Sequence, residues 1–207
     1  GYHPDEIYLQ PENSRPSAPT STRDKDIERF VTVIRFSSSL ALFILSVVLV
    51  AACIFTRQTS TTIGKEGWTY SVLVLIAFWF LIAWLALIEG GLGCLLGLKS
   101  LEASKYEHSH PHSFRNTDIV QKGDNMQRFI VGRQFLVVAI VFLCTWMLEP
   151  VLDVSVLGLP DVVNKIFLSS DLALIVILVI AGQLTAEVNA ASCMLDFINN
   201  RFVLYFV

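Results

Sequence analysis

Long runs of apolar residues alternate with shorter polar stretches along this chain of 207 residues. A helix rises about 1.5 Å per residue, so about 20 apolar residues suffice to cross the ~30 Å hydrocarbon core of a bilayer. Four runs reach that length, at about 31–55, 69–98, 129–148 and 172–197. The pattern therefore predicts an all-α fold, a polytopic helical membrane protein with four transmembrane helices.

The first 29 residues differ in character from the rest of the chain. Residues 1–29 are polar, carry four prolines and lack apolar periodicity, which is typical of an extended arm. The segment 24–29 (DKDIER) is where we expect a helix that leads into the membrane to begin. The transmembrane domain is then predicted over 30–207. Because the sequence stops within the apolar run FVLYFV, we expect this domain to be truncated at its carboxyl terminus.

The composition supports a membrane protein and excludes several other classes. Hydrophobic residues make up 54% of the chain and charged residues 16%, whereas soluble domains carry about 25% charged residues. With a net charge of −3 and no basic cluster interleaved with aromatics, we expect a lipid bilayer and no nucleic acid as partner. The four cysteines are scattered through apolar blocks, and no nucleophile triad or phosphate-binding loop occurs. The protein is not expected to be an enzyme.

Lysine and arginine residues indicate the orientation in the membrane. Five of them precede residue 36, two lie in the first loop, five in the loop 99–128 and one in the third loop. Cytoplasmic loops carry an excess of these residues. We therefore predict an integral, multi-pass protein with its amino terminus and the loop 99–128 on the cytoplasmic side.

Glu89 is the one charged residue in the apolar run 68–98, and a carboxylate at such a depth is a functional-site hypothesis in itself. Counted from the outer ends of their spans, Glu89 and Glu187 lie roughly 30 and 22 Å inward. Arg133 reaches a similar depth from the opposite direction. We predict a polar cluster on the cytoplasmic side, made of Glu89, Arg133, Gln134, Gln183 and Glu187. Alternatively, Arg133 and Glu187 extend separately to the lipid headgroups.

Three glycines, Gly90, Gly93 and Gly97, follow Glu89 at helical spacing. Small residues allow helix backbones to approach closely in lipid, so this face predicts a tight helix crossing or a dimer contact. The alternative is that the glycines interrupt the helix and expose carbonyl groups to an ion.

The loop 99–128 contains three alternating histidines, His108, His110 and His112, in the run EHSHPHSF. In an extended segment, side chains two residues apart point the same way, and Pro111 favours extension. The three imidazoles are therefore a candidate site for a transition metal. The alternative is an ordinary solvated loop, since no cysteine or second ligand pair accompanies them.

The last three spans contain short motifs that resemble those of a known family. The second span gives Glu-Gly-Gly-Leu from Glu89 and then Cys94, the third gives Gly-Arg-Gln from Gly132, and the fourth gives Gly-Gln-Leu-Thr-Ala-Glu from Gly182. Over residues 70–200, their order resembles the transmembrane domain of the CNNM/CorC family of magnesium transport proteins. The family's ion ligands are largely lost: Arg133 and Val137 stand where asparagines are expected, and Gln183 replaces a glutamate.

This resemblance implies magnesium-type ion transport or its regulation, with a divalent cation as a possible ligand and a homodimer as the assembly. Under it, Glu89 and Glu187 line or brace a cavity that faces the cytoplasm. The alternative, which the loss of ion ligands favours, is a non-catalytic structural or assembly subunit of a larger membrane complex.

Overall fold

The computed structural model describes residues 22–101, 105–151 and 156–206. Residues 1–21, which make up most of the predicted arm, lie outside the described residues. The chain divides into two compact units, 1–41 and 42–207, and the boundary falls within the first helix. That helix, α1 (Thr22–Phe55), begins close to the segment DKDIER, where a helix was expected to start.

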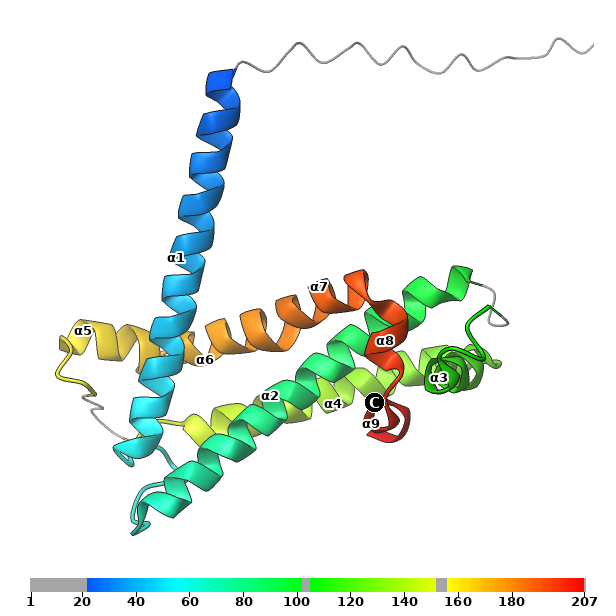
Figure 1. Ribbon diagram of the computed structural model, residues 1–207. Coiled ribbons are helices and arrows are strands. Elements are labelled where there is room, and N and C mark those ends of the chain that lie inside the picture. Colours follow the sequence, from blue (N-terminus) through cyan, green and yellow to red (C-terminus); the bar gives the residue numbers. More distant parts are fainter. Residues whose placement is uncertain (1–21, 102–104, 152–155, 207) are drawn as a thin grey trace, which may run out of the picture. The chain divides into compact units, whose positions relative to one another are not determined.

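Helices form nearly all the regular structure of the described residues; an isolated β-bridge joins Thr59 and Pro150. Besides α1, the long helices are α2 (Trp68–Gly97) and α4 (Asn125–Leu148). A fourth is composite, since α6 (Leu172–Ile177), the π-helical η4 (Leu178–Leu184) and α7 (Thr185–Ser192) follow one another directly (Figure 1). The shorter elements are η1 (Leu98–Ser100), α3 (Pro111–Gln121), α5 (Asp161–Asn164), η3 (Lys165–Ser169), α8 (Met194–Ile198) and α9 (Arg201–Phe206).

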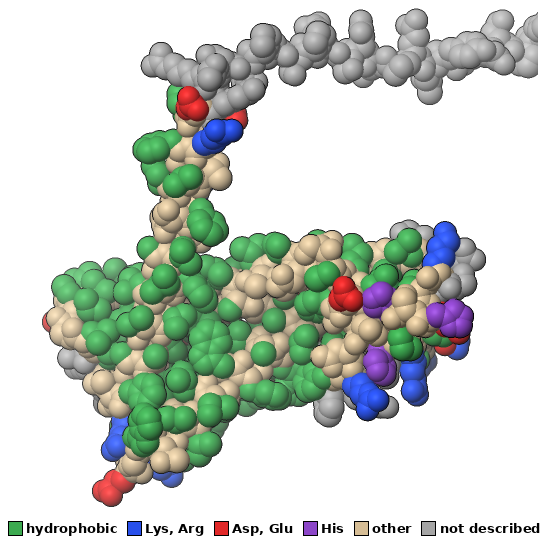
Figure 2. All heavy atoms as spheres, in the orientation of Figure 1, with side chains coloured by type: hydrophobic (Ala, Val, Ile, Leu, Met, Phe, Trp, Pro, Cys, Tyr) green, Lys and Arg blue, Asp and Glu red, His purple; other side chains and the backbone are tan. Residues whose placement is uncertain are grey.

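Four helical stretches are long and apolar enough to cross a membrane, which confirms the predicted fold class. Figure 2 shows hydrophobic side chains over the visible side of the unit 42–207, with the visible histidines and several lysine or arginine side chains at the end that carries α3 and further charged side chains at the opposite end. An apolar exterior of this kind suits a lipid environment. The four stretches are Asp26–Phe55, Trp68–Gly97, Asn125–Leu148 and Leu172–Ser192.

The fourth helix ends before the predicted boundary at 197. The backbone leaves the helical region at Cys193 (φ −142°, ψ 57°), and the chain resumes in a new direction as α8. The Ser192 hydroxyl bonds to the carbonyl oxygens of Val188 (2.9 Å) and Asn189 (3.1 Å). Side chains that bond to nearby carbonyls compete with the helical ladder, which gives a local reason for the break.

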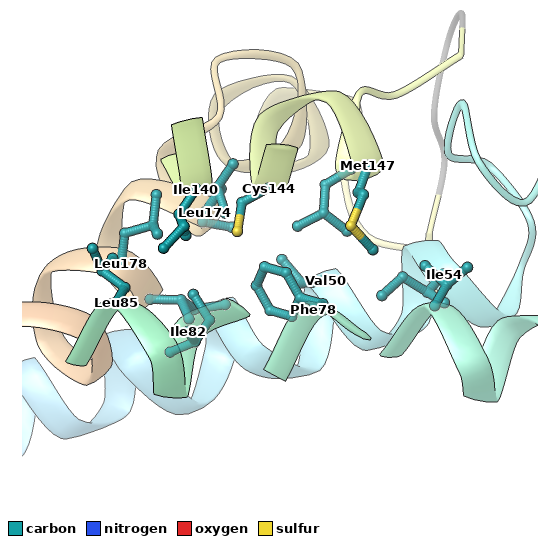
Figure 3. Close-up of a cluster of buried hydrophobic side chains, with 14 of the residues drawn as sticks. Val50, Ile54, Phe78, Ile82, Leu85, Ile140, Cys144, Met147, Leu174 and Leu178 are labelled. Atoms are coloured by element: carbon teal, nitrogen blue, oxygen red, sulfur yellow. The ribbon is translucent and has the colours of Figure 1, made fainter. Parts of the chain in front are cut away.

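The main core of the second unit lies where α1, α2, α4 and α6 meet (Figure 3). Phe78 of α2 is fully buried there, and close packing of this kind, rather than exclusion of water, holds helices together in lipid. The labelled side chains are Val50, Ile54, Phe78, Ile82, Leu85, Ile140, Cys144, Met147, Leu174 and Leu178.

One end of this core is joined by hydroxyl groups that bond to the last carbonyls of two helices. Ser60 Oγ donates to the carbonyl of Trp146 (2.5 Å) and Thr61 Oγ1 to that of Met147 (2.8 Å) at the end of α4. Ser71 Oγ, in α2, donates to the carbonyl of Ile54 in α1 (3.1 Å). Terminal carbonyls have no partner within their own helix, so these bonds link the helix ends of this region, which we call the turn end.

Candidate functional site

An ion pair joins α2 and α4 near the opposite end of the helices. The Arg133 Nη1 group donates a hydrogen bond to a carboxylate oxygen of Glu89. Only 15% of the Arg133 side chain and 13% of the Glu89 side chain are exposed. Glu89 lies in the last third of α2 and Arg133 in the first half of α4, so two helices that run in opposite directions bring the charges together.

Arg133 has further hydrogen-bonding capacity beside this pair. Its Nη2 group is 3.5 Å from Oε1 of the neighbouring Gln134, at the outer limit for a hydrogen bond. Its Nε group is buried and has no protein partner. A buried donor without a partner is rare in proteins and calls for an explanation. The site therefore offers a carboxylate acceptor, an amide and an unused guanidinium donor within one contact region.

The electrostatics of this pair make each member dependent on the other. Removal of one partner from a buried ion pair typically costs about 3–5 kcal/mol, because the remaining charge is left uncompensated in a medium of low dielectric. Arg133 lies beside the carboxylate in the position where a cationic ligand would have to bind. The local charge is thus close to balanced, which favours a neutral ligand over a divalent cation.

The composite fourth helix packs along α2 in parallel register. A Cβ atom added at Gly182 would lie 2.8 Å from Leu85, and one added at Gly90 would lie 3.2 Å from the Ala186 carbonyl oxygen. One added at Gly93 would meet the Ala190 side chain at 3.9 Å. This register sets Gln183 and Glu187 within about one turn of the depth of Glu89.

The five predicted polar residues divide into two groups in the structure. Glu89, Arg133 and Gln134 lie together, as described above. Glu187 is exposed and Gln183 is half-buried, and within the described part of the chain neither makes a hydrogen bond or ion pair with the other three. Helix α7 faces α2 with two small residues, Ala186 and Ala190. The side chains of Gln183 and Glu187 therefore lie outside this contact.

The glycine face of α2 is occupied by the same chain. Gly90, Gly93 and Gly97 lie against α7 and α8, and α2 stays helical through all three positions. At Gly97, a Cβ atom would approach Met194 Sδ to 2.6 Å. The glycines therefore permit a close crossing within one chain, and the helix shows no interruption that would expose carbonyls.

The three histidines are not arranged as an extended run. Pro111 is the first residue of α3, a position that suits its fixed φ and missing N–H, so His112 already belongs to a helix. His110 Nε2 instead lies 3.1 Å from Asp196 Oδ1 of α8, and its Nδ1 lies 2.8 Å from Ser109 Oγ. Among the described residues, no three histidine, cysteine or acidic side chains gather as a metal site. The geometric basis of the metal prediction is therefore missing.

The sequence reading missed α8 and its contact with the site. The ring of Phe197 packs against Gly90, the residue next to Glu89, so closely that a Cβ atom on Gly90 would overlap it. The segment MLDFI continues the apolar pattern of the fourth span, which conceals the change of direction. The one available signal was the group of side chains around Ser192 that compete for helix carbonyls.

Comparison with known protein families adds one finding. A sequence model described as "Silicon transporter" matches residues 28–207, whereas no curated protein and no solved structure matches the chain. The resemblance to the CNNM/CorC family is therefore wrong, and the magnesium assignment that depended on it has no support. The shared motifs were short groups of glycine and polar residues, which recur wherever helices pack closely in a membrane.

Proposed function

Because the chain belongs to the silicon transporter family, we propose that it carries silicic acid across the membrane and that the Glu89–Arg133 pair binds this solute. The family is one of transporters rather than enzymes by its description. Four helices that are long and apolar enough to cross a membrane support a multi-pass location in a lipid bilayer.

The observation that carries the proposal is the hydrogen-bonding capacity of the buried pair. Silicic acid is a small weak acid whose four hydroxyl groups stay protonated at neutral pH, so each can donate and accept a hydrogen bond. The Glu89 carboxylate accepts, whereas the Nε group of Arg133 is a buried donor without a protein partner. Charged partners form the stronger hydrogen bonds, and in a low dielectric they compensate for the solute's lost water.

The charge balance also supports a neutral solute. Arg133 neutralises Glu89, so entry of an uncharged molecule leaves the net charge of the site unchanged. The amide of Gln134, next to Arg133, is available as a further partner. Gln183 and Glu187 lie at a similar depth. We propose that they line the transport path beside the Glu89–Arg133 pair without contacting that pair.

The lysine and arginine bias supports an orientation in which the loop 99–128 faces the cytoplasm. A homodimer or a larger complex would need a surface other than the glycine face of α2, since α7 and α8 of the same chain cover that face.

The direct test is uptake into lipid vesicles that contain the purified chain, followed by the molybdate colour reaction of silicic acid. Glu89→Gln is expected to lower the initial rate about tenfold or more, because it leaves Arg133 without its buried partner. The matched control is Asp118→Asn, which breaks an exposed ion pair with Lys122 (2.7 Å) and should leave the rate unchanged.

Two outcomes would contradict the proposal. A wild-type rate equal to that of empty vesicles, together with copurification of fixed partner chains, would favour the subunit interpretation. Equal rates for wild type and Glu89→Gln would support transport but would show that the Glu89–Arg133 pair does not bind the solute.

A further inference from the structure

The short helix α8 lies across the last turns of α2. It starts directly after the non-helical residue Cys193 and contains five residues. Figure 1 shows it between the end of α7 and the loop that carries α3. An isolated helix of this length is unstable in water, so its position depends on the contacts that it makes with α2 and α3.

The contact with α2 is made by two side chains that fit onto glycines. Phe197 packs on Gly90, and Met194 packs on Gly97. Any larger residue at Gly90 would have to displace the aromatic ring. Glu89 turns toward α4 while the adjacent Gly90 turns toward α7 and α8, so the ring covers α2 next to the ion pair, on the side of the fourth helix.

The contact with α3 is made by polar groups that bond to α8 and the residues after it. Ser113 Oγ donates to the Leu195 carbonyl (2.6 Å), and Asn116 Nδ2 donates to the Ile198 carbonyl (2.9 Å). Both side chains are buried. The backbone N–H of His112 donates to Asn199 Oδ1 (3.2 Å), and His110 Nε2 pairs with Asp196. Asp196 is exposed, so solvent weakens its pairing with His110.

These observations describe a short element with a break at one end and separate side-chain bonds along its length, two of them from buried donors. The apolar side chains of α8 pack in the cluster that contains Cys94, with Ile198 fully buried. A five-residue element outside the long spans, held otherwise by separable side-chain bonds, still opens locally at lower free energy than a long helical core. A helix that is continuous with α7 would have no such point of rotation. Transport also requires that the binding site be reached from one side at a time.

We propose that α8 is the gate at this end of the transport path, with Phe197 as its gating side chain and α3 as the strap that holds it closed. In the closed state, the Phe197 ring keeps water and solute away from the region of Glu89. Rotation about Cys193, with release of the α3 bonds, opens that region. The inference rests on the proposed function for its solute, but its first test does not require silicic acid.

The first test measures access to Cys94, which is buried in the same apolar cluster against which Phe197 packs. The other three cysteines are replaced by serine or alanine, and a membrane-impermeant maleimide is added on the α8 side, predicted to be cytoplasmic. Phe197→Ala is expected to raise the labelling rate about tenfold or more, since it removes the ring that closes the region. Equal labelling of wild type and variant would overturn the gate.

The matched control is Phe129→Ala, which removes the same side chain from α4 beside the same cluster. It should leave labelling near the wild-type rate; an increase equal to that of Phe197→Ala would mean general loosening and would also overturn the proposal. If Phe197→Ala does not fold, Ser113→Ala releases one strap bond and leaves the ring in place. It is then expected to raise labelling about threefold, and no increase would count against the gate.

The second test locks the gate. With the native cysteines replaced, His110→Cys and Asp196→Cys are joined by a short bis-methanethiosulfonate, which forms a reducible disulfide with each thiol and releases sulfinate. Silicic acid uptake should fall about tenfold or more on cross-linking and recover on reduction. Unchanged uptake in the cross-linked protein would overturn the gate. Absence of uptake in the wild type would instead contradict the proposed function, while Cys94 labelling would still decide the gate.

Discussion

The two ends of the helical unit 42–207 are held by different kinds of bond. At the turn end, main-chain groups pair directly: the N–H of Ser60 bonds to the Glu149 carbonyl (2.8 Å), and that of Val151 to the Gln58 carbonyl (3.0 Å). Hydroxyl bonds to the last carbonyls of α4 add to these. At the other end, α8 is attached to α3 mainly through side chains.

This difference assigns a role to each end. At the turn end, the main-chain hydrogen bonds and the hydroxyl bonds to terminal carbonyls join the same few residues. The chain segments there can therefore separate only if several hydrogen bonds break at once. Side-chain bonds at the α8 end can be lost one at a time, and the break at Cys193 gives the chain a place to turn. The turn end is therefore expected to stay fixed while the α8 end moves.

The largest expected effect concerns the ion pair that lies near the mobile end. Arg133→Met alone should lower the free energy of unfolding by about 3–5 kcal/mol, because Glu89 is left as an uncompensated charge. The double variant Glu89→Gln with Arg133→Met should recover most of that loss. Thermal unfolding in detergent measures both, and additive effects of the two substitutions would show that the charges are not coupled.

The next effect tests the strap. Asn116→Ala leaves the Ile198 carbonyl without its partner, at a cost of about 1–3 kcal/mol. Hydrogen exchange should become about tenfold faster at the amides of α8, and remain unchanged in the turn 58–63. Equal acceleration at both ends would break the proposed contrast between them.

A smaller effect is expected at the fixed end. Ser60→Ala removes the hydroxyl bond to Trp146 but keeps the main-chain bond from Ser60 to Glu149. We expect a loss of about 0.5–1.5 kcal/mol in unfolding free energy and no change in silicic acid uptake. A large fall in uptake without a matching loss of stability would mean that the turn end also moves.

The smallest effect is a pH dependence at the turn end, outside the spans. Burial, and then the nearby charge of Glu149, raise the pKa of Asp171 above its ordinary value of 3.8. The folded state therefore binds this proton more tightly than the unfolded state does, and the contribution to stability is lost as pH rises from about 3.8 through the raised pKa.

Asp171→Asn should remove that pH dependence and slightly raise the melting temperature at neutral pH. Asparagine tolerates the left-handed backbone of this residue (φ 58°), so the turn itself is kept. A melting temperature that still falls with rising pH in the variant would show that another group is responsible.

Much of this organisation follows from the sequence by simple length and depth arguments. The apolar runs predict the four spans because backbone groups in lipid must be paired within helices. The depth count also brought Arg133 to the level of Glu89, since charges at equal depth on neighbouring helices gain by pairing. The contact between them appears in the structure.

Other features depend on information that a linear pattern does not hold. Gln183 and Glu187 lie at a depth similar to that of Glu89, as predicted. Their side chains point in other directions around the helix, which separates them from the Glu89–Arg133 pair. The break at Cys193 lies within unbroken apolar sequence, and the histidine run was misread because proline begins helices as readily as it favours extension. From the sequence, the glycine face could form a contact between two chains or within one chain. In the structure it packs against α7 and α8 of the same chain.

The break between α7 and α8 has a practical consequence for spectroscopy. Cys193 is exposed, whereas Cys53, Cys94 and Cys144 are buried. A thiol-reactive fluorophore should therefore attach at this residue first, without any substitution. The unaltered chain thus supplies its own reporter at the point of rotation, and the dye's anisotropy can follow α8 in real time as solute is added.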